Sequence, residues 1–134
     1  LMISRIVLSQ SSLSECEGNN NNISSFSLGH FNKIRKWTNC LGTAIGPDGE
    51  IYVGEFVDGN FQGQGIYVKD DGGGGFMYTG EFFEDEFHGK GTKIFSYGPF
   101  TTFAKLLLLK ESFKGGTRAN TIKGVWENGE LVEE

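Results

Sequence analysis

The chain contains one sequence pattern twice, Tyr-Val-Gly-Glu-Phe at 52–56 and Tyr-Thr-Gly-Glu-Phe at 78–82. A second pair follows at the same offset of 26 positions (78 − 52 and 87 − 61), Phe-Gln-Gly-Gln-Gly at 61–65 and Phe-His-Gly-Lys-Gly at 87–91. Self-similarity at a fixed spacing indicates repeated supersecondary units stacked along one axis. We therefore expect a repeat protein.

Each unit has the pattern of a β-hairpin. In residues 51–57, Tyr52, Gly54 and Phe56 share one face of an extended chain. Asp58-Gly59 follows, which is a hairpin-turn signal because Gly tolerates a positive φ. The return strand is predicted at about 61–69.

The glycines of the return strand predict how rings pack. Gly63 and Gly65 lie two residues apart and so share a face, where they leave bare backbone. We expect the aromatic ring of a neighbouring unit to lie in that gap.

A second glycine spacing gives the basic period. The segments 42–49, 65–72 and 91–98 each begin and end with Gly, and their starts are 23 (65 − 42) and 26 (91 − 65) residues apart. We interpret the period as 23, with three extra residues in the glycine run 72–75. A loop insertion of this kind leaves the stack intact.

The pattern from Tyr52 to Gly65 resembles the MORN repeat (membrane occupation and recognition nexus). The second copy departs from it at Asp85, which stands where the first has Gly59, and this is expected to weaken the turn. The resemblance covers about 39–130 and implies an all-β fold, an elongated single-layer antiparallel sheet of stacked hairpins. The array is predicted over 39–134, with its best repeats at 51–72 and 77–98.

The flanking segments are less regular. Residues 1–38, rich in Ser and Asn, are predicted to be irregular or ordered by a partner, and 39–49 to be the second strand and exit turn of a worn repeat. A degenerate hairpin is favoured at about 103–117, with a helix over 102–114 as the alternative. Residues 122–134 resemble a terminal half-repeat.

Composition and charge exclude some classes of function. The net charge of −5 lies wholly on residues 51–134, which hold 8 basic and 13 acidic residues (8 − 13 = −5). An acidic array is a poor match for nucleic acid. The longest apolar run, 106–109, is far shorter than the roughly 20 residues of a membrane span.

Cys16 and Cys40 have no metal-site spacing, and two cysteines do not make a disulfide framework. Because the sequence shows no secretory signal, reduced thiols and an intracellular, cytoplasmic location are expected.

Catalysis, cofactors and metals are not expected. His30 and His88 have no accompanying nucleophile motif, and the acidic cluster 81–86 lacks the ligand spacing of a calcium loop. Glu55 and Glu81 recur with the period, so they are expected to pair with a backbone N–H or a basic side chain of the next unit.

The periodic residues have two interpretations. The rings can be core within each repeat, or they can line a concave face that accepts a partner's peptide or helix. In the second interpretation, the residues that bind the partner are Tyr52, Phe56, Tyr78, Phe82 and Trp126. Roles in turns and stacking are assigned to Gly54, Gly59, Gly63, Gly65, Gly80, Gly89, Gly91, Gly124 and Gly129.

The resemblance implies a non-catalytic interaction or scaffold module that binds a protein partner or a second copy of itself, with a cytoskeletal or ciliary role among the options. One alternative is a regulatory repeat domain of a larger enzyme. Another is a peripheral protein on anionic lipid, with contacts from Lys33, Arg35, Lys36 and Trp37. Three cations contribute only about 3 kcal/mol at such a surface, and a solvated face is the favoured interpretation.

Overall fold

A computed structural model describes residues 12–20, 25–70, 74–96 and 119–134 of the chain. The degenerate repeat predicted at 103–117, and its helical alternative at 102–114, lie outside these residues. The described elements are α2 (Leu28–Ile34), β1 (Cys40–Ile45), β2 (Ile51–Val57), β3 (Asn60–Asp70), β4 (Gly75–Phe83), β5 (Glu86–Ser96), β6 (Ala119–Glu127) and β7 (Glu130–Glu133).

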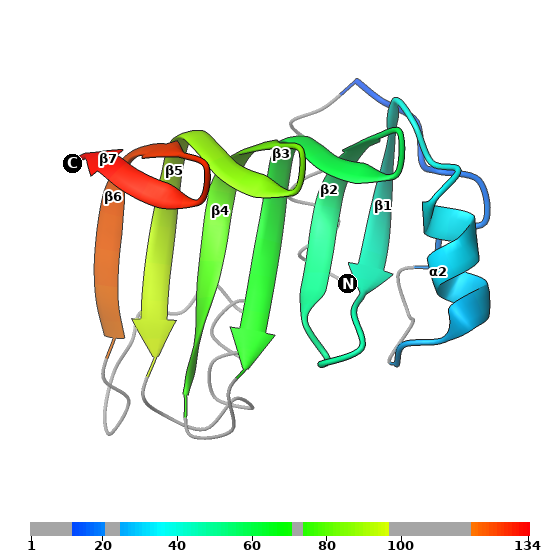
Figure 1. Cartoon of the computed structure of the whole chain (residues 1–134), viewed down its shortest axis with the longest axis horizontal. Helices are drawn as coiled ribbons and strands as arrows, with labels where there is room; N and C mark the ends of the chain where they lie inside the picture. Colours follow the sequence, from blue (N-terminus) through cyan, green and yellow to red (C-terminus); the bar gives the residue numbers. More distant parts are fainter. Residues whose placement is uncertain (1–11, 21–24, 71–73, 97–118) are drawn as a thin grey trace.

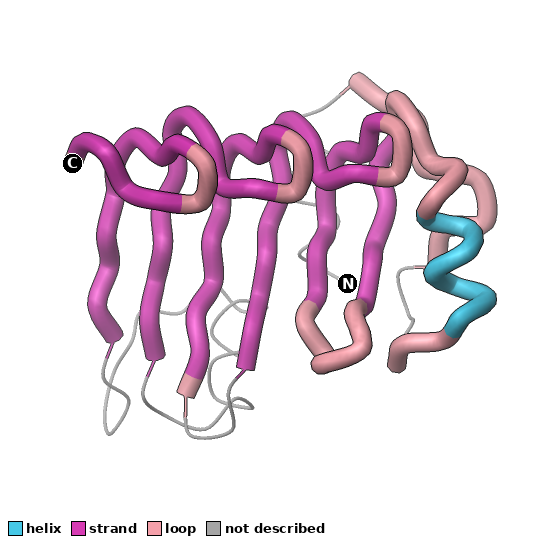
Figure 2. The backbone as a smooth tube through the Cα atoms, in the orientation of Figure 1, coloured by secondary structure: helices cyan, strands magenta, loops and turns pink. Residues whose placement is uncertain are grey.

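The seven strands form one antiparallel sheet in the order of the sequence, β1 to β7. Figure 1 shows the open sheet, with α2 beside β1 at one end and β7 at the other. The turns of the β2–β3, β4–β5 and β6–β7 hairpins lie along one edge, where the strand ends curl across the sheet (Figure 2). The predicted all-β single-layer fold is confirmed, and its N-terminal segment also contains the short helix α2.

A row of glycines crosses the sheet just before the strands curl. Six glycines on six neighbouring strands pair in register, so that the row has no side chains on either face. The pairs are Gly42↔Gly54, Gly54↔Gly65, Gly65↔Gly80, Gly80↔Gly91 and Gly91↔Gly124.

Aromatic rings fill the space that the glycine row leaves. A Cβ at Gly65 would lie 2.5 Å from Cε1 of Tyr52, and a Cβ at Gly91 would lie 2.5 Å from Cε2 of Tyr78. Each ring therefore covers a glycine of its own hairpin, whereas we had expected a ring from a neighbouring unit. Within a hairpin the two residues are close along the chain, so the contact can form as the hairpin closes.

A glutamate side chain stabilises the β-bulge in each of the two hairpins β2–β3 and β4–β5. The register shifts at Glu55 and at Glu81, where the carboxylates accept the backbone N–H of Gln64 and of Lys90, the latter at 2.6 Å. The predicted backbone pairing is confirmed, but the acceptor and donor belong to one hairpin and not to successive units. Gly63 and its counterpart Gly89 have the same role in the two copies, since a φ of 65° and 57° and the nearby carboxylates of Glu55 and Glu81 leave no room for a Cβ.

The hairpin turns link each repeat to the one before it. Gly59, Asp85 and Gly129 all have positive φ and donate their backbone N–H to the carbonyls of Trp37 (2.7 Å), Phe61 (3.1 Å) and Phe87 (3.1 Å). Asp85 also accepts the Phe61 N–H on its carboxylate at 2.8 Å. Asp85 has a positive φ of 71° without being glycine, so the expected weakening of this turn stays a prediction, and the Asp85 side chain adds a hydrogen bond between repeats.

The N-terminal segment covers the outer edge of β1. Three N–H groups of that edge, on Leu41, Thr43 and Ile45, donate to Ser14 O (2.9 Å), Asn19 Oδ1 (2.8 Å) and His30 Nε2 (3.3 Å). An exposed edge of unpaired backbone groups would be a template for pairing with other chains. The predicted worn repeat at 39–49 thus has its first strand replaced by a cap.

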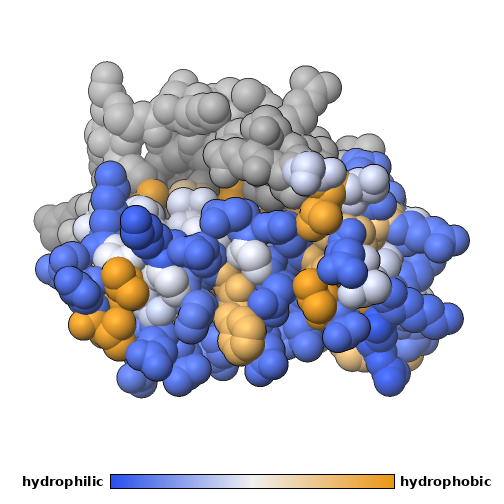
Figure 3. Space-filling model, turned by 90° about the horizontal axis from the view of Figure 1, so that it is seen from above, coloured by the Kyte–Doolittle hydropathy of each residue, from blue (hydrophilic) through white to orange (hydrophobic). Residues whose placement is uncertain are grey.

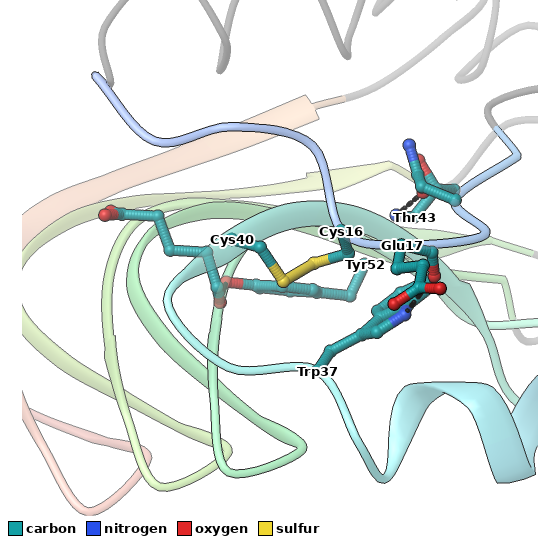
Figure 4. Close-up of a disulfide and its surroundings, with 8 residues drawn as sticks. Cys16, Glu17, Trp37, Cys40, Thr43 and Tyr52 are labelled. Atoms are coloured by element: carbon teal, nitrogen blue, oxygen red, sulfur yellow. Dashed lines mark hydrogen bonds between the residues drawn. A yellow bond between two sulfur atoms is a disulfide. The ribbon is translucent and has the colours of Figure 1, made fainter.

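Trp37 and a disulfide hold this cap (Figure 4). The Trp37 ring covers Gly42 as Tyr52 covers Gly65, and its Nε1 donates to Glu17 O at 2.8 Å. Cys16 and Cys40 are joined, with Cα atoms 4.8 Å apart, so the expectation of reduced thiols is wrong. The predicted intracellular location loses that support and stays a prediction.

Replacing Gly91 by alanine tests the packing of rings on the glycine row. Because the new Cβ would overlap the Tyr78 ring, Gly91→Ala is expected to lower the free energy of unfolding by about 1–3 kcal/mol in chemical denaturation.

Gly29→Ala is the matched control, since a Cβ at Gly29 of α2 would meet nothing within 4 Å. This variant is expected to be as stable as the wild type or slightly more stable, as alanine is the better helix former. Equal stability of the Gly91→Ala variant and the wild type would contradict the packing described.

Candidate partner-binding groove

The five rings predicted to bind a partner form the core of the array. Tyr52, Phe56, Tyr78, Phe82 and Trp126 have between 0% and 5% of their surface exposed. Their edge-to-face contacts run through the sheet, with ring centroids 5.2 Å apart for Tyr52–Phe56, 5.0 Å for Tyr52–Phe82, 5.1 Å for Tyr78–Phe82 and 5.6 Å for Tyr78–Trp126. The interpretation of these rings as core is therefore what the structure supports, and an exposed row made of them is not present.

Both buried tyrosine hydroxyls have hydrogen-bond acceptors. Tyr52 donates to Glu55 O at 2.8 Å, with Gln62 O at 3.4 Å, and Tyr78 donates to Glu81 O at 2.9 Å, with His88 O at 3.2 Å. Burial raises the pKa of Tyr78 to about 12 and raises the pKa of Tyr52 further. The two hydroxyls thus stabilise the β-bulge of their own hairpin, and their protons are engaged in hydrogen bonds to backbone carbonyls.

A groove of about 910 Å³ lies over this core. Its wall contains four half-buried rings, Phe61, Tyr67, Phe76 and Phe87, which touch one another across β3, β4 and β5. Their centroids are 6.4 Å apart for Phe61–Tyr67, 5.8 Å for Tyr67–Phe76, 6.0 Å for Tyr67–Phe87 and 6.1 Å for Phe76–Phe87. Of the five predicted rings, Tyr52 and Phe82 reach the lining of the groove.

Two of the groove rings rest directly on the core tyrosines. Phe61 is stacked on Tyr52 with centroids 3.9 Å apart, and Phe87 is stacked on Tyr78 with centroids 4.0 Å apart. Each tyrosine is thus enclosed between a glycine on one side and a phenylalanine on the other. The repeat that builds the core therefore also places rings at the surface of the groove.

The sequence contained a signal for part of this lining. Phe61 and Phe87 occupy the same place in the two copies of the pattern, yet we assigned them only to the return strands. Tyr67 lies two residues beyond Gly65 and pairs in register with Tyr78, next to Phe76. The alternation of side chains along β3 and β4 places Tyr67 and Phe76 on the face that carries the core tyrosines. The sequence did not show which of the two faces of the sheet would be covered, because the N-terminal cap could not be predicted.

The residues predicted to contact lipid are divided by the structure. Lys33, Arg35 and Lys36 are exposed, whereas Trp37 is 4% exposed and belongs to the cap. A contact with anionic lipid would have to rest on the three cations without the indole. No helix among the described residues is long and apolar enough to cross a bilayer.

The two histidines lie in different environments. His30 is 8% exposed and accepts a backbone N–H, and burial together with the charge of Lys33 lowers its pKa. His88 is exposed on β5 beside Phe83. In the described parts of the chain, no three His, Cys, Asp or Glu side chains are grouped so that they could hold a metal ion.

The repeat pattern also matches a known protein family. The family model described as MORN repeat matches residues 52–74 and 78–96. These segments begin at Tyr52 and Tyr78, the two tyrosines that cover the glycine row. No curated protein matches the chain.

The buried hydroxyl of Tyr78 predicts how stability depends on pH. An exposed tyrosine ionises near pH 10, so between about pH 10 and 12 the unfolded chain loses this proton while the folded chain keeps it. The stabilisation is complete below pH 10 and is lost as the pH rises through about 12.

Denaturation at pH 8, 10 and 11 measures this effect, with Tyr78→Phe as the comparison. The variant is expected to be about 1 kcal/mol less stable at pH 8, where it lacks the hydrogen bond. Its stability should then fall less steeply with pH than that of the wild type, and parallel curves would be the contrary result.

Proposed function

We propose that this chain, which contains MORN repeats at residues 52–74 and 78–96, is a non-catalytic module that holds a protein partner in the groove. Such repeats are generally associated with modules that bind proteins or membranes. The partner contacts the half-buried rings Phe61, Tyr67, Phe76 and Phe87. The buried rings beneath them keep this surface rigid.

The observation that carries the proposal is the continuous row of partly exposed rings in a concave surface. Aromatic side chains in a partly desolvated pocket are the residues that contribute most to binding energy at protein interfaces. A rigid groove also requires little ordering on association, because its rings are fixed by contacts to the core below. Both features favour recognition of another protein.

The lining residues support a binding role over a catalytic one. Among the described residues of the groove there is no serine, cysteine or histidine, and the hydroxyl of Tyr52 at its base donates to a backbone carbonyl. Nucleophilic catalysis requires a nucleophile within reach of a base. The groove offers apolar contact surface with charged residues at its borders.

Phe76 is the residue with which to test the proposal, since its ring is half-buried in the groove wall on β4. In a quantitative pull-down from lysate, Phe76→Ala is expected to weaken capture of the proteins bound by the wild type at least about tenfold, the loss of about 1.4 kcal/mol.

Phe83→Ala is the matched control, because Phe83 lies on the same strand, is 48% exposed and is not part of the groove. It should leave the captured proteins unchanged. Equal losses from the two variants, with the β-sheet spectrum retained in both, would mean that the groove is not the binding surface.

A further inference from the structure

The groove is formed on the face of a fully paired sheet. Its central strands β3, β4 and β5 each pair on both sides, so their backbone N–H and C=O groups are engaged in the sheet. An extended peptide gains affinity from backbone hydrogen bonds at a sheet edge, and this face offers none. A helix pairs its own backbone groups and can dock with side chains alone.

The side of the groove next to the hairpin turns is acidic. Asp58, Asp85 and Glu86 are exposed and line it. The Asp85 carboxylate is held in place by the Phe61 N–H. Seen from above in Figure 3, this turn edge is mainly hydrophilic, with small separate hydrophobic patches.

The opposite side, toward the far ends of β3 and β5, carries Lys69, and Lys93 lies beside the lining. Lys69 lines the groove and pairs in register with Phe76. Lys93 places its Nζ 4.3 Å from the centroid of Phe76 and 4.9 Å from that of Phe95. Burial among these rings lowers the pKa of Lys93, so a nearby carboxylate would compensate for the water that this ammonium has lost.

The ring row lies between the two charged sides. Phe61 and Phe87 are near the turns, and Tyr67 and Phe76 lie farther along the strands toward Lys69. At the end beside α2, Arg35 lies against the Gly59 turn, and Glu50 precedes Ile51, which pairs with Val68 beside Lys69. Across its middle, from the hairpin turns to the far ends of the strands, the groove therefore presents acidic side chains, then aromatic rings, then a lysine.

On the premise that the groove is the binding surface, we propose that its occupant is an amphipathic helix whose apolar stripe faces the rings. One flank of the stripe carries Lys or Arg, which face Asp58, Asp85 and Glu86. The other flank carries Asp or Glu, which face Lys69 and Lys93. Opposite charges on the two flanks fix the direction in which the helix lies along the groove, because reversing it would bring like charges together.

A displayed library of helical peptides tests this inference with the full chain as bait. The apolar stripe is kept as leucine, and both flanks are randomised among Lys, Glu and Ala. We expect enriched peptides to have Lys on one flank and Glu on the other. Attraction to the net charge of −5 alone would instead enrich Lys on both flanks.

Two charge reversals then locate the basic side. Lys69→Glu is expected to weaken binding of an enriched mixed-flank peptide about three- to fivefold and to strengthen binding of the peptide with Lys on both flanks. Lys90→Glu changes the net charge equally at an exposed residue that does not line the groove. It should leave binding of the mixed-flank peptide unchanged and strengthen binding of the doubly basic peptide less than Lys69→Glu does. If the charge reversal disturbs folding, Lys69→Gln, which only removes the charge, replaces Lys69→Glu in the same binding measurement.

The outcomes separate the inference from the proposed function. If no peptide is enriched, the helix inference is overturned, while the proposed function is judged separately by the Phe76→Ala pull-down. If peptides are enriched with Lys on both flanks, and Lys69→Glu acts no differently from Lys90→Glu, the groove binds helices but the proposed charge pattern is wrong. Mixed flanks together with a specific effect of Lys69→Glu support the inference.

Discussion

The structure depends on the contact between a tyrosine ring and a glycine on the paired strand. Tyr52 over Gly65 and Tyr78 over Gly91 leave no space for a Cβ at either glycine. The glycines that pair across the sheet make this contact available in the β2–β3 and β4–β5 hairpins. Just beyond the row, a glutamate bulge and a two-residue turn redirect the strands, and this curvature produces the groove.

Edge-to-face contacts join the hairpins into one unit. Phe82 of the second repeat packs against Tyr52 of the first, and Trp126 packs in the same way against Tyr78. At the front of the array, Trp37 contacts Phe56 with centroids 5.1 Å apart and covers Gly42. A repeat protein is stabilised by such interfaces between neighbours, and an end without a neighbour needs a cap. The disulfide and the hydrogen bonds to the β1 edge provide that cap at one end.

The sequence predicted those features that recur with the period, since two copies of Tyr, Gly, Glu and Phe at one spacing define a hairpin and its faces. It could not predict the partner of each group. Glu55 was expected to reach the next unit, but the bulge turns its carboxylate back to Gln64. The sequence offered Trp37 only as part of a less favoured lipid contact, and its burial was not predicted because it depends on Gly42, Glu17 and Phe56 together. The Cys16–Cys40 disulfide results from the cap, for which no sequence pattern was available.

The central claim is that buried rings couple successive repeats, and a double-mutant cycle between Tyr52 and Phe82 tests it most directly. Each ring is replaced by leucine, singly and together, and the free energies of unfolding are measured by chemical denaturation. For an edge-to-face pair with centroids 5.0 Å apart, we predict a coupling energy of about 1 kcal/mol. The pair Tyr52 and Trp126, which share no ring contact among the described residues, should be additive. Additivity of Tyr52 and Phe82 as well would contradict the account.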